Sequence, residues 1–226
     1  MTTRTQDLLM TLLGAVGLKI VFSDAYLHYV NPWMRWPILA ASLVVIALSM
    51  RYVFAKSLDP TEHEIHVPNV TWLLLLPALV LFVIAPPELG AYAAERRTGV
   101  SAPRPTPTSS TTAGSTALVD TPVSEFVSLA QWESARDLTS PVALTGFVSK
   151  DPHDAWYITR MGISCCAADA IGWRVRVVGA PAPERDQWVR VTGTWIDPHK
   201  PVPRIGDPAI TATDVTFVKK PRNTYE

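Results

Sequence analysis

Residues 188–195 read WVRVTGTW, and this stretch decides the class of the carboxy-terminal half of the chain. Valines alternate there with Arg190 and Thr192. A period of two is typical of an antiparallel strand with one buried face and one face in water. Gly193 interrupts the alternation, and a glycine inside such a pattern indicates a bend or a bulge. We therefore expect residues 188–195 to form a strand that bends at Gly193.

Four neighbouring stretches share this alternation or the same β-branched and aromatic bias. The five predicted strands are VALTGFVSK (142–150), AWYITRMGI (155–163), WRVRVVGA (173–180), WVRVTGTW (188–195) and ITATDVTFVKK (210–220). Together with glycine bends at Gly146, Gly179 and Gly193 they predict a small antiparallel β-barrel, similar to the oligonucleotide/oligosaccharide-binding (OB) barrel. Residues 123–135, VSEFVSLAQWESA, show helical spacing and predict a short helix that packs against it.

The amino-terminal half is apolar enough to lie in a membrane. The chain has 226 residues, of which 48% are hydrophobic, and their long uncharged runs all precede residue 90. We expect three transmembrane helices, at residues 8–26, 33–52 and 68–87, although Lys19 interrupts the first. A cleaved signal peptide is the alternative for that first segment, but no small-residue cleavage pattern follows it.

These patterns predict an α + β membrane protein with three parts. Residues 1–97 form a transmembrane domain, residues 98–117 a linker rich in Pro, Ser and Thr, and residues 118–226 the OB-like β-barrel domain. The positive-inside rule gives no orientation, because basic residues divide evenly between the two sides. Linkers of this composition commonly precede extracellular domains, so we expect a multi-pass plasma-membrane protein with an extracytoplasmic carboxy-terminal domain.

Charge and motifs exclude several classes of function. Lys and Arg total 20, as do Asp and Glu. From residue 118 onward the chain has 12 basic and 13 acidic residues. A domain without a basic face is unsuited to nucleic acid. The sequence also lacks Gly-x-Ser-x-Gly and His-Glu-x-x-His motifs, so we expect no enzyme.

The two cysteines, Cys165 and Cys166, are adjacent and are the strongest candidates for a functional site. They could be two small buried side chains, a strained disulfide, or a pair of thiolates that binds a soft or borderline metal ion. Adjacent side chains on a strand point to opposite faces, so both sulfurs reach one ion only if the chain turns at this point. Asp169 is close enough in sequence to add an oxygen, and Asp151, His153 and Asp154 could do so if their loop lies alongside.

A second candidate cluster, EHEIH at residues 62–66, precedes the third predicted span. His63 and His66 would share one face of a helix and could bind a divalent cation with Glu62. The alternative is an ordinary polar helix end at the membrane interface.

Several of these stretches together resemble a known family. YVNPWM (29–34), HEIH (63–66) leading into TWLLLLPALVLFVIAPPELG (71–90), RMGISCCAADA (160–170) and WVRVTGTW (188–195) are similar to the small subunit of a proposed two-component bacterial membrane permease. The most specific of them is ISCCAADA (163–170).

The resemblance implies an accessory subunit that works beside a multi-span permease in the lipid membrane, in transition-metal transport or homeostasis, with zinc as one candidate metal. In that family the cysteine-pair motif falls on Cys165, Cys166 and Asp169, and the histidines on His63 and His66. Two other functions stay open: a thiol redox protein that cycles a vicinal dithiol, and a cell-envelope adaptor.

Overall fold

The computed structural model describes residues 3–23, 25–58, 89–96, 119–132, 140–199, 204 and 206–226. The chain divides into two compact units, residues 1–88 and residues 89–226. The third predicted span, His63, His66 and the 98–117 linker all lie outside the described residues. Those predictions are therefore neither confirmed nor contradicted.

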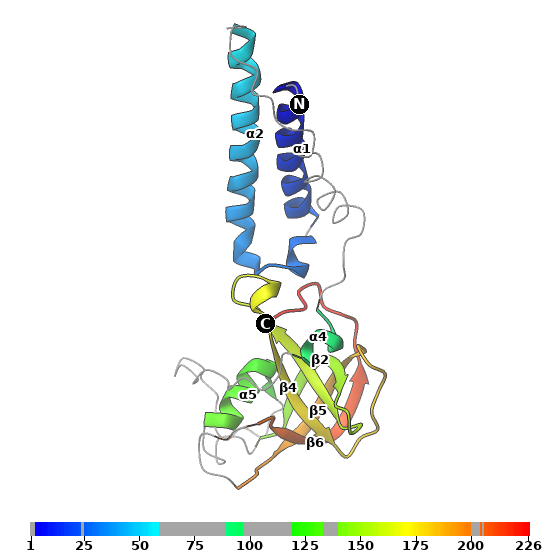
Figure 1. The fold of residues 1–226 in the computed structure, drawn as a ribbon. Helices are drawn as coiled ribbons and strands as arrows, with labels where there is room; N and C mark the ends of the chain where they lie inside the picture. The colour runs from blue at the N-terminus through cyan, green and yellow to red at the C-terminus, as the bar shows by residue number, and fades with distance from the viewer. Residues whose placement is uncertain are drawn as a thin grey trace. The chain divides into compact units, whose positions relative to one another are not determined.

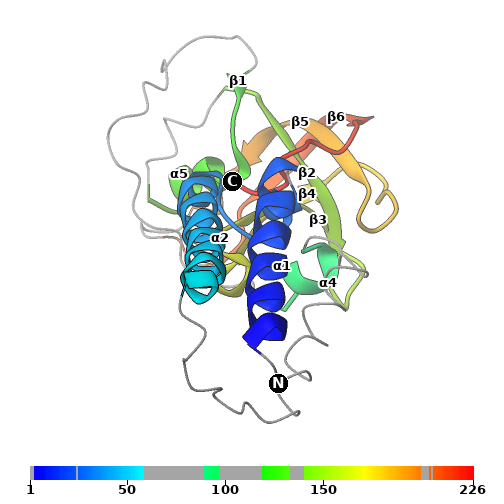
Figure 2. The ribbon, with the colours of Figure 1, turned by 90° about the horizontal axis from the view of Figure 1, so that it is seen from above.

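The amino-terminal unit contains two long helices that run antiparallel, α1 (Thr3–Phe22) and α2 (Arg35–Leu58). Two 3₁₀ turns, Ala25–His28 and Pro32–Met34, connect them. Figure 2, seen from above, shows the two helices side by side. They coincide with the first two predicted spans, with boundaries that differ by a few residues.

Small and hydroxylated side chains line the contact between α1 and α2. A Cβ atom on Gly14 would collide with Ile46, and one on Gly17 would collide with Ser42. The Thr11 and Ser49 hydroxyls are hydrogen-bonded at 2.7 Å. Larger apolar side chains on both helices point away from this contact and are exposed. They include Leu13, Phe22, Trp36, Leu43 and Leu48.

One described helix is long and apolar enough to cross a membrane, at Pro32–Arg51, and a shorter apolar helix covers Met10–Phe22. Length and composition alone make this weak evidence for membrane association. It nevertheless agrees with the predicted membrane character of the amino-terminal half.

The carboxy-terminal unit is built on a sheet of five long strands (Figure 1). They are β2 (Val142–Lys150), β3 (Trp156–Gly162), β4 (Ile171–Val178), β5 (Trp188–Ile196) and β6 (Ala209–Phe217). Each coincides with a predicted strand. With the helical amino-terminal unit, they confirm the α + β class.

The strand pairing closes on itself. The order is β2-β3-β4-β6-β5, and β5 pairs with β2 again. All these pairs are antiparallel except β4 with β6, which is parallel. At Gly146 and Phe147, β2 passes from pairing with β5 to pairing with β3, and a Cβ on Gly146 would collide with the backbone of Thr159. The predicted bend at Gly193 coincides with a register shift against β6.

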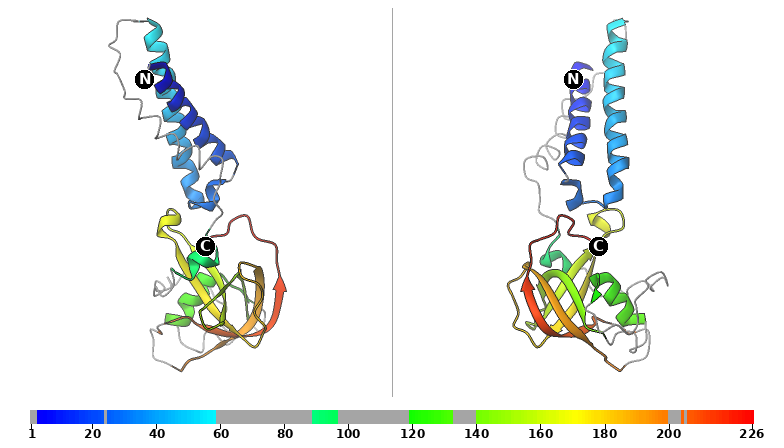
Figure 3. Two further views of the ribbon diagram at one scale, coloured as in Figure 1. Left: turned by 45° about the vertical axis from the view of Figure 1, so that its right-hand side comes forward. Right: turned by 180° about the vertical axis from the view of Figure 1, so that it is seen from behind.

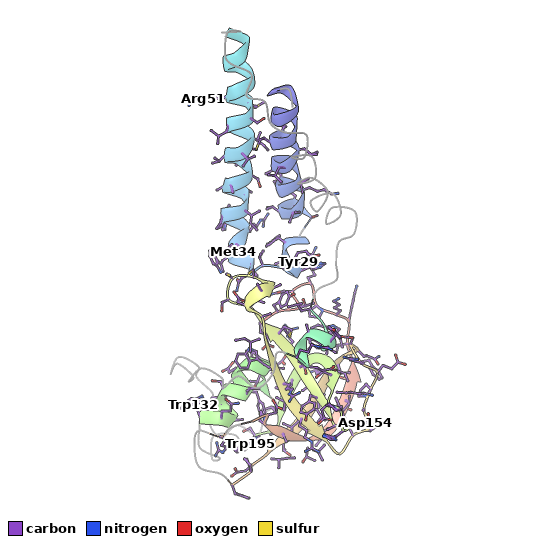
Figure 4. The ribbon with its side chains drawn as sticks, viewed as in Figure 1. Tyr29, Met34, Arg51, Trp132, Asp154 and Trp195 are labelled. Carbon is purple, nitrogen blue, oxygen red and sulfur yellow. The ribbon has the colours of Figure 1, made fainter. Side chains whose placement is uncertain are left out.

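Three short elements accompany the strands: α4 (Ala91–Ala94), the two-residue strand β1 (Val119–Asp120), which pairs parallel with β2, and the predicted helix α5 (Val123–Trp132). Figure 4 labels Trp132 at the end of α5 and Trp195 near the end of β5. The core of the unit contains α5 residues such as Phe126 together with strand residues such as Leu144, Ile158 and Val191, all buried. A second apolar cluster joins α4, the ends of the β3–β4 connection and Tyr225.

Candidate functional site

The two cysteines lie in the connection between β3 and β4, at residues 163–170. The strand pairing ends at Gly162 and Ile171, which face each other. Ile163 and Ala170, the first and last residues of the connection, are buried in the second apolar cluster. We call residues 163–170 the thiol loop. Its two ends are fixed in the core, whereas its middle is exposed or half-buried.

Asp169 holds the backbone of the thiol loop in a tight turn. Its Oδ1 accepts a hydrogen bond from the Ser164 N–H at 2.8 Å. Its Oδ2 accepts from the Cys165 N–H at 2.8 Å and from the Cys166 N–H at 3.2 Å. The Asp169 N–H in turn donates to the Cys166 side chain, which completes a capping box at the 3₁₀ turn Ala167–Asp169. The chain therefore turns at the cysteines, as a shared metal site requires.

Both sulfurs lie on the same side of the turn. Cys165 is exposed, Cys166 is half-buried, and both are free thiols. Their sulfur atoms are 3.6 Å apart. The interpretation as two buried apolar side chains is therefore wrong, because neither residue is buried.

The spacing of the sulfurs suits one tetrahedral ion. With metal–sulfur bonds of about 2.3 Å, two sulfurs 3.6 Å apart subtend an angle of about 103° at the metal. This angle is close to tetrahedral and far from the straight S–metal–S arrangement of a two-coordinate ion. The geometry thus fits zinc, or another ion with the same preference, as a two-sulfur chelate.

The electrostatics of the loop keep the Cys165 thiol protonated. A hydrogen bond to the Asp169 carboxylate, followed by one to Cys166, raises the pKa of Cys165 to about 11. The same hydrogen bond from Cys165, with those from the loop backbone, lowers the pKa of Asp169 well below its usual range. At neutral pH the loop therefore carries a carboxylate and a neutral Cys165 thiol, and a metal ion must displace that proton to bind.

Asp169 is a weaker candidate ligand than the cysteines. One oxygen from its carboxylate and the two sulfurs all lie within 4.8 Å of one another. Three backbone N–H groups already use that carboxylate, so its main role is to shape the loop. Among the described residues, no other group of three metal-binding side chains is this close together. The thiol loop alone supplies half of a tetrahedral site, and donors from outside it would have to complete the shell.

The structure separates Asp151, His153 and Asp154 from the cysteines. They lie in the β2–β3 turn, at the opposite end of β3 from the thiol loop, and Figure 4 labels Asp154 at that end. The Asp151 carboxylate accepts hydrogen bonds from the His153 N–H, the Ala155 N–H and the Tyr157 hydroxyl. The expectation that this turn could complete the metal site is therefore wrong, because a seven-residue strand lies between the two ends.

The sequence did not predict the anchoring of the thiol loop. Ile163 and Ala170, the two ends of the loop, are buried in the second apolar cluster together with Met161 on β3. The only signal in the sequence is that apolar residues bracket the polar SCCAAD segment. Such a short pattern does not distinguish an anchored loop from an ordinary strand end.

Comparison with known proteins places the thiol loop in a described domain. Residues 137–226 match the family model of the DUF1980 C-terminal domain. The match covers the five long strands and supports a relationship to the DUF1980 family for this part of the chain. No curated protein and no solved structure matches the chain.

Proposed function

We propose that this protein is a non-enzymatic accessory subunit of a membrane permease complex, and that its β domain captures a transition-metal ion, with zinc as the candidate, through Cys165 and Cys166. The observation that carries the proposal is the 3.6 Å separation of two accessible sulfurs on one side of a fixed turn. A loop that presents two sulfurs at chelating distance has the donor set that borderline ions prefer.

The incomplete shell favours transfer over storage. A structural zinc site is closed by four protein ligands, whereas two sulfurs leave about half of the tetrahedron open. An exposed ion held in this way exchanges ligands readily with another donor. The partner in this proposal is a multi-span permease, which would complete the shell transiently and receive or release the ion.

The amino-terminal helices support the membrane part of the proposal. Large apolar side chains such as Leu13, Phe22 and Trp36 face outward, while Gly14, Gly17 and Ser42 lie at the helix contact. Small residues at the interface and bulky apolar residues outside are typical of helices packed in lipid. We therefore propose a multi-pass plasma-membrane protein. The extracytoplasmic location of the β domain is part of the same proposal and rests on the composition of the linker.

The closed ring of strands supports an OB-like barrel. Five strands, antiparallel except for β4 with β6, return to β2 through β5. This is consistent with the small five-stranded barrel in which binding sites form from strand connections. Two of its basic side chains have acidic partners: Arg174 pairs with Asp207, and Arg190 with Asp120. These pairs favour a role that does not involve nucleic acid.

A redox function is the second candidate, because two free thiols 3.6 Å apart could be oxidised to a vicinal disulfide. The raised pKa of Cys165 argues against it, since reactive cysteines usually have a lowered pKa. A metal ion can still bind a thiol with a raised pKa, because it displaces the proton. Mass spectrometry after alkylation of cells would separate the two functions: a pair that is two hydrogen atoms lighter and resists alkylation supports redox cycling. The cell-envelope adaptor remains a third proposal, in which neither chemistry operates.

The direct test is metal content. Full-length protein purified in mild detergent, dialysed against buffered zinc, should retain one zinc per chain. The Cys165→Ser and Cys166→Ser variants should lose it, whereas Ser164→Ala, which leaves both sulfurs and all backbone donors of the loop in place, should retain it. Equal zinc content in all four proteins would exclude the cysteine site.

A further inference from the structure

The segment 89–96, which contains α4, packs against the β domain. Ala91 and Ala94 are fully buried. They belong to the same apolar cluster as Phe147 and Trp188, and Leu89 packs against this cluster too. Figures 1 and 3 show α4 beside the strands. Although these residues were predicted to belong to the transmembrane domain, their described contacts are with the strands.

Polar contacts fix the start of the segment. The Asp186 carboxylate accepts a hydrogen bond from the Ala91 N–H at 2.6 Å. A Cβ atom at position 90 would lie 2.5 Å from the same oxygen, so a larger residue there would displace the carboxylate. The Leu89 N–H donates to the Tyr225 hydroxyl at 3.3 Å. The chain is therefore held as soon as it enters the domain.

The end of the segment is held as well. The Glu95 carboxylate accepts a hydrogen bond from the Lys150 N–H at 3.2 Å and forms an ion pair with Arg185. Contacts at both ends and two buried alanines between them give eight residues a defined position on the domain.

The same apolar cluster contains the two buried ends of the thiol loop. Ile163 and Ala170 are buried in it together with Ala91, Ala94 and Met161. A change in the position of the loop ends therefore acts on the packing of α4, because buried apolar groups have little room to move independently.

Residues 89–96 lie in the sequence between the third predicted span and the rest of the β domain. The third predicted span ends at residue 87, and Leu89 already packs in the β domain. The described residues of the domain end at Arg96 and resume at Val119. The 98–117 linker thus connects two parts of one domain, and the covalent path from the amino-terminal region into that domain runs through residues 89–96.

We propose that residues 89–96 are a latch that joins the β domain to the predicted membrane span. The packing of these residues on the β domain, which we call docking, is coupled to whether the thiol loop holds a metal ion. The coupling rests on the proposed metal function, whereas the docking does not. Coupling between two sites is reciprocal: if metal at the cysteines strengthens docking of the latch by some factor, docking strengthens metal binding by the same factor, and complete loss of docking removes that gain.

Hydrogen exchange in the full-length protein in detergent tests the docking. The amides of Ala91, Ala94 and Glu95 should be protected without metal, because they donate to Asp186, Gly90 and Ala91 respectively. Exchange of the 89–96 segment at the rate of an unstructured peptide would overturn the latch, whatever the zinc content of the sample.

Position 186 offers a clean variant, because Asp186 has a φ of 65°. Glycine adopts this backbone conformation without strain, so Asp186→Gly removes the carboxylate and leaves the turn intact. It should speed exchange of the segment by roughly tenfold, in line with the loss of a capping carboxylate. Asp120→Gly, which breaks the exposed pair with Arg190, should leave exchange of residues 89–96 unchanged. Equal effects of the two variants would contradict the specific role of Asp186.

Zinc titration of the same samples tests the coupling. In the wild type, zinc should slow exchange of residues 89–96, and Asp186→Gly should weaken zinc binding by at most the factor by which zinc strengthens docking. The Cys165→Ser/Cys166→Ser variant should keep the metal-free protection and lose the response to zinc. Zinc that binds at the cysteines without changing exchange of the segment would overturn the coupling. If residues 89–96 are protected without metal but the protein binds no zinc, the coupling and the proposed function are both overturned. The docking of the segment would then still be established.

Discussion

Cys165 and Cys166 present their sulfur atoms 3.6 Å apart because Asp169 gathers the backbone N–H groups of both residues on one oxygen. On a regular strand these two side chains would diverge to opposite faces. A single carboxylate thus converts two adjacent residues into a chelating pair, and it also raises the pKa of Cys165.

Replacing the carboxylate should make Cys165 more reactive. Because hydrogen bonding to Asp169 is the largest cause of the raised pKa of Cys165, Asp169→Asn should lower that pKa from about 11 towards the ordinary value of a thiol. The thiolate is the reactive form, so alkylation of Cys165 at pH 8 should accelerate by roughly tenfold or more. Peptide mass spectrometry after timed iodoacetamide treatment measures the rate. Asp214→Asn on β6 serves as the control, and an unchanged rate in Asp169→Asn would contradict the role assigned to the carboxylate.

Zinc affinity should rise with pH. A Cys165 thiol with a pKa of about 11 is protonated throughout the physiological range, and zinc binding releases its proton. Each proton released adds about one logarithmic unit of affinity per pH unit, so the slope between about pH 6 and pH 9 should be at least one. Competition with a chelator of known pH dependence measures it. A flat profile would mean that zinc binds to groups other than this thiol.

Glu226 should stabilise the β domain more than a surface charge does. Its carboxylate accepts hydrogen bonds from the Val123 and Ser124 N–H groups at the start of α5 and pairs with Arg160, with 14% and 12% of the two side chains exposed. Glu226→Ala leaves these groups without their acceptor and should cost about 1–3 kcal/mol.

The control is Asp120→Ala, because the Arg190–Asp120 pair is more exposed, at 35% and 64%. Its loss should cost less than about 1 kcal/mol. Urea-dependent hydrogen exchange of the β2–β6 peptides in the full-length protein gives both values. Equal losses of unfolding free energy in the two variants would show that Glu226 stabilises the domain no more than the exposed Asp120 does.

The strands were predictable because each carries its own local signal. In β4, Trp173, Val175 and Val177 are buried while the arginines between them are half-buried or exposed, as the alternation indicates. Gly193 was recognised as a bend from its place in the pattern, and the register shift confirms it. Local alternation and glycine placement therefore sufficed for the strands of this domain.

The site was only partly predictable because its geometry depends on contacts that sequence spacing does not encode. That Asp169 lies near the cysteines follows from its position, but its role as acceptor for three N–H groups does not. The membership of Ala91 in the β domain was missed for a similar reason. Four helical residues are too few to show periodicity, and the partner that holds them, Asp186, lies 95 positions away.

The spectrum of the cobalt-substituted full-length protein tests the central claim most directly, because cobalt(II) reports both geometry and sulfur ligation. One equivalent should produce a sulfur-to-cobalt charge-transfer band with the intensity of two thiolates and the strong visible bands of a tetrahedral site. The band should disappear in Cys165→Ser, in Cys166→Ser and in the double variant, because each single variant already loses the ion. A weak octahedral spectrum without a sulfur band, identical in all four proteins, would contradict the proposal that the two cysteines hold one ion.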